Sequence, residues 1–116
     1  MSEIRQGQVY WLDFGAAATS VPAERHPCVV VQNDIFNRSA IATTVVCLII
    51  SNLARAKAPG NVLLKKSEAN LPKASVVNVS QILTVDKVEL VEYIGQLSGA
   101  GVTAVRDGLH LLFDRL

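Results

Sequence analysis

The segments "PCVVVQ" (residues 27–32) and "TTVVCLII" (residues 43–50) decide the fold of this chain. Each segment is short, dominated by apolar residues and rich in β-branched ones, which is typical of strands buried on both faces of a sheet. Between them, "NDIFNRSA" (residues 33–40) supplies Asn, Asp and Ser, the residues that favour turns. The stretch therefore predicts two central strands separated by a polar turn.

Further strands are predicted on both sides of this pair. "GQVYWLDF" (residues 7–14) is rich in aromatic and β-branched residues and precedes a loop of small residues, "GAAATSVPAE". Three downstream segments also have ordinary strand length; they are "NVLL" (61–64), "ASVVNVSQILTV" (74–85) and "LVEYIGQL" (90–97). A short helical turn is possible at residues 86–90.

The last part of the chain, from Ser98 onward, has a different periodicity. Its apolar residues Val102, Val105, Leu109 and Leu112 recur at helical spacing. Ser98 is a suitable N-cap for this helix. Short strands followed by one amphipathic helix predict a mainly β (α+β) fold. We expect a small, strongly curved antiparallel sheet or barrel with the helix packed on an open end. No repeat or linker divides the sequence, so residues 1–116 are expected to form a single domain.

The composition and charge of the sequence limit the kinds of protein that it can encode. The chain is 50% hydrophobic and carries a net charge of +1, so it should fold, and it could bury further surface in an oligomer. Residues 1–75 hold 8 Lys and Arg against 5 Asp and Glu, and residues 76–116 hold 3 against 5. This asymmetry is compatible with a polyanionic partner or with a merely solvated surface. The two cysteines lack metal-ligand spacing, and no signal peptide or membrane span is apparent, so a cytoplasmic protein without a metal is expected.

The ordered motifs "RQGQVYWLDF", "RHPCVVVQND", "ISN", "APGNVLL", "LPKASVVNVSQILTVDK" and "IGQL" resemble the MazF/PemK family, the toxins of bacterial toxin–antitoxin pairs. The resemblance spans nearly the whole chain. It implies an SH3-like barrel with added helices, a homodimer, and sequence-specific cleavage of single-stranded RNA without metal or cofactor. It also implies a cognate antitoxin (MazE-like) whose extended acidic segment occupies the RNA groove.

Metal-free RNA cleavage requires specific side chains. The neighbouring 2′-hydroxyl attacks the phosphorus, which leaves a 2′,3′-cyclic phosphate and a 5′-hydroxyl. A base, an acid and a stabiliser of phosphoryl charge are needed. The resemblance implies an arginine directly before the proline, yet here His26 precedes Pro27 and Arg25 is displaced by one position. Adjacent strand residues face opposite ways, so Arg25 need not reach the place to which His26 points. Histidine can exchange protons near neutrality but stabilises phosphate charge less well than a guanidinium.

Two further positions depart from the family pattern. Ile50 occupies the position of an expected threonine and has neither donor nor acceptor. Ser51 could replace that threonine only if the end of the strand bulges or twists. Val21 stands where many relatives carry Glu or Gln. These departures leave two main hypotheses, a working endoribonuclease and a catalytically weakened module that binds nucleic acid or antitoxin. Action on a protein target through the C-terminal helix is a third.

The candidate catalytic residues are therefore Arg25, His26 and Ser51. The candidate substrate-binding residues are polar side chains from the loops and strand ends, namely Ser20, Asn33, Arg38, Asn52 and Gln81. Each has a plainer alternative, because loop hydroxyls and amides often satisfy the local backbone and asparagines often form turns. Amides also pair well with the edges of unstacked RNA bases.

Overall fold

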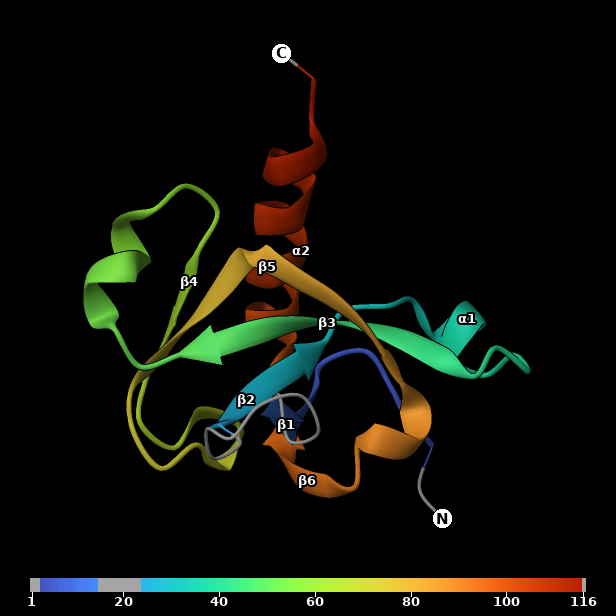
Figure 1. Cartoon of the computed structure of the whole chain (residues 1–116). Coiled ribbons are helices and arrows are strands. Elements are labelled where there is room, and N and C mark those ends of the chain that lie inside the picture. Colours follow the sequence, from blue (N-terminus) through green and yellow to red (C-terminus); the bar gives the residue numbers. More distant parts are fainter. Residues whose placement is uncertain (1–2, 15–23, 116) are drawn as a thin grey trace.

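One six-stranded antiparallel sheet organises the molecule (Figure 1). The computed structural model describes residues 3–14 and 24–115. In space the strands follow the order β4, β5, β3, β2, β1, β6, so both segments that decide the fold lie in the middle of the sheet, as predicted. The strands are β1 (Gln8–Phe14), β2 (Glu24–Val30), β3 (Thr43–Ile50), β4 (Val62–Leu64), β5 (Ser75–Asp86) and β6 (Glu92–Gln96).

The sheet is strongly curled because β5 pairs with β3 in two separate stretches. Leu48 of β3 is opposite Asn78, whereas the preceding Cys47 is opposite Ile82. Residues 79–81 of β5 therefore have no counterpart on β3, and extra residues of this kind bend a strand and increase its twist. Figure 1 shows β5 changing direction as it passes β3. The result is a half barrel, which agrees with the predicted curved sheet.

Both faces of the central strands are covered by apolar residues. Val29 and Cys47 belong to one buried cluster, and their neighbours Cys28 and Val46 belong to the other. This alternation confirms that the apolar runs are strands buried on both sides. Burial raises the pKa of the Cys28 and Cys47 thiols to about 12. Both cysteines are thus packing residues that stay protonated at neutral pH.

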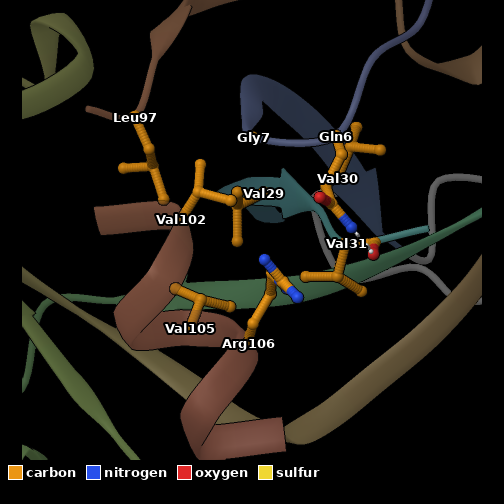
Figure 2. A pocket seen from close by; sticks show the side chains of 9 residues that line it. All are labelled: Gln6, Gly7, Val29, Val30, Val31, Leu97, Val102, Val105 and Arg106. Carbon is orange, nitrogen blue, oxygen red and sulfur yellow. Dashed lines mark hydrogen bonds between the residues drawn. The ribbon is translucent and has the colours of Figure 1, made fainter. Parts of the chain in front are cut away.

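Helix α2 (Gly99–Phe113) covers the face of the sheet that contains Val29. The Ser98 side chain accepts a hydrogen bond from the Gly101 N–H, so the predicted N-cap is confirmed. Figure 2 shows Val102 and Val105 beside Val29. A hollow of about 10 Å³ lies between helix and sheet at this place. That volume holds roughly one water molecule, so this contact is packing and offers no ligand site.

The apolar face of α2 is shorter than its spacing predicts. Val105 is buried and Leu109 packs on the core, but Leu112 is 42% exposed. Closer to the middle of the helix, Gly108 touches Gly60, whose carbonyl oxygen would collide with any added Cβ. The absence of a side chain at Gly108 therefore lets α2 approach the chain just before β4.

Several short helices occupy segments that were expected to be turns or links. Helix α1 (Asp34–Asn37) lies within "NDIFNRSA", where a turn was predicted. It forms because the Asn33 side chain accepts the Ile35 N–H as an N-cap. The 3-10 helices are η1 (Leu53–Lys57), η2 (Glu68–Asn70) and η3 (Lys87–Glu89), the last at the predicted helical turn. Within the described ranges, no helix is long and apolar enough to cross a membrane.

Candidate functional site

The start of β2 and the end of β3 lie side by side at one edge of the sheet. Cys28 is opposite Leu48 in this antiparallel pair, and continuing the register places His26 next to Ile50. Two adjoining pockets open at this edge, and both are lined by His26, Ile50 and Ser51. We call them the Arg25 pocket and the Gln81 pocket.

The Arg25 pocket has a volume of about 220 Å³. Its remaining lining residues come from β1, β2, β3, the segment before β5 and the first residue of β5; they are Trp11, Arg25, Pro27, Ile49, Leu71, Pro72, Lys73 and Ser75. The exposed Lys73 side chain brings a second positive charge to this wall.

The guanidinium of Arg25 is held in place by three contacts. Its Nη2 donates to Glu92 Oε2 at 2.6 Å, and its Nε lies 3.4 Å from Asp13 Oδ1. The same group lies over the Trp11 ring, 4.7 Å from the ring centroid. Because 44% of the Arg25 side chain is exposed, these ion pairs contribute little to stability. They do orient the guanidinium and offset part of its charge.

His26 and Arg25 project from opposite faces of β2, as the strand alternation predicts. The residue paired with His26 is Leu12, which belongs to the same buried cluster as Cys28, whereas Arg25 is paired with Asp13. Consequently the Gln81 pocket is lined by His26 but not by Arg25. The imidazole therefore lines both pockets, whereas the guanidinium, displaced by one residue, lines only the Arg25 pocket.

Ser51 lies where the two pockets meet. Strand β3 ends at Ile50, and the chain bends at Ser51. Ser51 therefore lies just beyond the regular alternation of β3, and it lines both pockets together with His26. Ile50 itself contributes only apolar surface there.

The Gln81 pocket is larger, about 490 Å³, and more polar. Asn52 caps η1 by accepting the Ala54 N–H, and Arg55 projects from the same helix. Asn78 and Gln81 come from β5; Asn78 is opposite Leu48 of β3, and Gln81 is the last of the three residues that have no counterpart on β3. The irregularity in β5 thus delivers two amide side chains to the edge at which β3 ends.

Sequence reasoning missed Arg55 and Asn78 as site residues. Arg55 was visible only as one of several cations, and the helix that carries it was not predicted. Asn78 lies in an otherwise apolar strand segment, "VVNV", where a buried amide requires hydrogen-bond partners. That isolated polar residue was the available signal.

Two predicted substrate-binding residues, Asn33 and Arg38, lie at the opposite end of β2 and β3. Asn33 lies shortly after β2, which ends at Val30, and Arg38 precedes β3, so the length of both strands separates them from His26 and Ser51. The structure therefore brings Arg25, His26, Ser51, Asn52 and Gln81 to the two pockets but leaves Asn33 and Arg38 outside them. Ser20, like Val21, lies outside the described residues.

Together the half-barrel fold and the two pockets define a small curled-sheet protein with a candidate nucleic-acid interface at one strand edge. The sequence profile described as PemK-like, MazF-like toxin of type II toxin–antitoxin system matches residues 5–113. Endoribonuclease MazF2 of Mycobacterium bovis is 39% identical over 111 residues, covering 96% of this chain and 97% of the relative. Endoribonuclease MazF6 of Mycobacterium tuberculosis shows the same identity and coverage.

A solved structure supports the same relationship. An endoribonuclease in complex with its cognate antitoxin, from a mycobacterial species, has a TM-score of 0.77 and 26% sequence identity. The match covers 97% of this chain and 99% of that one. The chain belongs to the family of PemK-like, MazF-like toxins of type II toxin–antitoxin systems.

Proposed function

We propose that this protein is an endoribonuclease toxin that cleaves single-stranded RNA at a short sequence, without metal, leaving a 2′,3′-cyclic phosphate and a 5′-hydroxyl. Family membership and the names of its relatives support the activity. The single observation that carries the location is that two pockets with cationic residues in their walls meet at His26 and Ser51. A single strand of RNA that runs along both pockets would place one phosphate at their junction.

The residues at this junction can divide the work of cleavage. The His26 imidazole would take the proton of the attacking 2′-hydroxyl or donate one to the departing 5′-oxygen. Arg25 and Lys73 on one side and Arg55 on the other would stabilise the negative charge that develops on the phosphoryl oxygens. The Ser51 hydroxyl, which lines both pockets, would hold a phosphoryl oxygen by a hydrogen bond.

The same proposal includes partners and setting. The cationic rim made by Arg25, Arg55 and Lys73 suits an extended acidic segment of a cognate, MazE-like antitoxin, which would compete with RNA for the pockets. We further propose that residues 1–116 act as a single domain, as a homodimer, in the cytoplasm. The structure of a relative bound to its cognate antitoxin supports the antitoxin as a partner.

Incubation of the purified protein with a long single-stranded RNA in excess chelator tests the activity. We expect discrete cuts at a recurring short sequence, with cyclic-phosphate 3′ ends and 5′-hydroxyl ends identified by end-specific ligation. RNA that stays intact over a wide range of protein concentrations contradicts the proposal. Cleavage that disappears with chelator and returns with a divalent cation contradicts its metal-independent chemistry.

A second candidate, a weakened nuclease that mainly binds RNA or antitoxin, is favoured by two observations. The Arg25 guanidinium is already engaged by Asp13 and Glu92, and Ile50 contributes no polar atom at the junction. If this second function holds, RNA binds with a steep salt dependence but is cut slowly. The double substitution His26→Arg and Ile50→Thr should then raise cleavage sharply, whereas in a competent enzyme it lowers or preserves the rate.

A further inference from the structure

The side chain of Asn61, which precedes β4, has an orientation fixed by the backbone. Its Oδ1 accepts the Val79 N–H at 3.0 Å, and its Nδ2 donates to the Arg55 carbonyl oxygen at 2.9 Å. A backbone N–H can only donate and a backbone carbonyl can only accept. The oxygen and nitrogen of the Asn61 amide therefore cannot exchange places without losing both contacts.

This fixed amide determines the orientation of Asn78. Asn61 Nδ2 also donates to Asn78 Oδ1 at 3.2 Å, and Ser80 Oγ donates to the same oxygen at 3.2 Å. Asn78 is only 9% exposed, so a reversed amide would place two NH₂ groups face to face where little water can compensate. The Asn78 oxygen is thus directed to Asn61, and its nitrogen is directed to Gln81.

The orientation of the Asn78 amide in turn determines that of the Gln81 amide, which lines the Gln81 pocket. Its Oε1 accepts Asn78 Nδ2 at 2.7 Å. Its Nε2 donates to no other residue in ranges 3–14 and 24–115, and the exposed Gln81 side chain lines the pocket. The amide therefore presents N–H donors there, while its oxygen is occupied. Arg55, on the same pocket, adds a group that can only donate.

We propose that the amide chain Asn61–Asn78–Gln81 makes this pocket select a keto base, uracil or guanine, at one position of the bound RNA. Uracil O4 and guanine O6 are acceptors, whereas cytosine and adenine carry an amino donor at the corresponding place. An N–H donor of Gln81 that faces the amino group of cytosine or adenine leaves both groups without a hydrogen-bond partner. This selectivity rests on the proposed function for the identity of the ligand, and it assigns the specificity to a defined set of hydrogen bonds.

Selection from a randomised pool of single-stranded RNA, 2′-O-methylated to prevent cleavage, tests the selectivity by binding alone. We expect one position in the bound fraction to favour uracil or guanine over cytosine and adenine by about tenfold. Equal representation of the four bases at every position overturns the proposal. Cleavage of unmodified RNA is measured separately, so a protein that binds with keto preference but does not cut refutes only the enzymatic function.

Two substitutions should reverse the preference. In Asn78→Asp the new carboxylate can only accept, so Gln81 must donate its Nε2 to it and present Oε1 to the pocket. In Gln81→Glu the new carboxylate accepts from Asn78 and presents its second oxygen. Both variants should favour cytosine or adenine at the same position.

Asn52→Asp is the matched control, because it adds the same negative charge to the same pocket outside the amide chain. Its carboxylate can still cap η1. We expect it to weaken binding of all sequences alike, with the keto preference retained. If Asn52→Asp reverses the preference as well, or if both Asn78→Asp and Gln81→Glu retain it, the amide chain does not set the specificity.

Discussion

The two ends of the β2–β3 pair carry similar residues but use them differently. At the end where β2 stops, Asn33 and Asn37 follow the strand; at the end where β3 stops, Ser51 and Asn52 do. At the first end the polar atoms form hydrogen bonds within the protein. The buried Asn37 amide accepts from Gln32 Nε2 and Thr44 Oγ1 and donates to the Gln32 carbonyl oxygen and Asp34 Oδ1.

The other end keeps polar atoms available. Asn52 uses its oxygen to cap η1, but Ser51 and Gln81 line open pockets. The difference comes from the surroundings of each end. Lys87 reaches the Asn37 carbonyl oxygen at 2.9 Å and helps to close the first end, whereas the irregularity in β5 brings amides to the second end without filling it. Whether polar residues after a strand are enclosed or left at an open pocket thus depends on distant parts of the chain.

Replacing His26, at the open end, should have the largest effect on the rate of RNA cleavage. We expect His26→Ala to lower the initial rate of RNA cleavage by about 10²- to 10⁴-fold, because a positioned acid or base contributes that much. The measurement is the rate on one mapped cleavage site. His110→Ala is the matched control, since His110 lies on an exposed part of α2 away from both pockets.

Cleavage rates that stay unchanged in both histidine variants would show that the imidazole at the strand edge is not part of the chemistry. A fall in both would point to a loss of folded protein, which far-ultraviolet circular dichroism can detect. Only a selective loss in His26→Ala supports a role of the open end in cleavage.

The course of the strands could be predicted from the sequence because local pattern and burial agree. "PCVVVQ" and "TTVVCLII" are apolar at consecutive positions, and their side chains fill both faces of the sheet. The helix was equally clear up to Leu109. Leu112 was not, because the spacing of apolar residues shows which face of a helix is apolar but not how far the sheet beneath it extends.

The site was harder to predict because it depends on contacts between distant segments. Strand alternation correctly separated Arg25 from His26, a local property of β2. The role of Asn78 depends instead on Asn61, seventeen positions earlier, and on the residues of β5 that lack a counterpart. The α1 helix, which uses Asn33 as a cap, competes with a turn of similar composition, and sequence alone did not distinguish them.

Removing Asn37 tests the closed end through stability. Asn37→Ala should lower the free energy of unfolding by about 3 kcal/mol, because buried partners such as the Thr44 hydroxyl lose their hydrogen bond. Denaturant unfolding measures the loss, and cleavage per folded molecule should not change. Asn52→Ala is the counterpart at the open end; it should cost only about 1 kcal/mol as a lost cap while weakening RNA binding. If both variants affect stability and binding to the same degree, the two ends do not differ in the way described.

The smallest expected effect separates two exposed arginines, one at each end. Arg55→Ala should weaken binding of a non-cleavable RNA by about tenfold and reduce the slope of log affinity against log salt by about 1, because one phosphate contact is lost. The substitution spares the Asn61 contact, which uses the backbone carbonyl of Arg55. Arg38→Ala removes the same charge at the closed end, where the Arg38 backbone N–H caps α1, and should change binding by less than about twofold. A larger effect from Arg38→Ala would instead support the assignment of Arg38 to RNA binding made from the sequence. It would also extend the RNA path along the full length of β2 and β3.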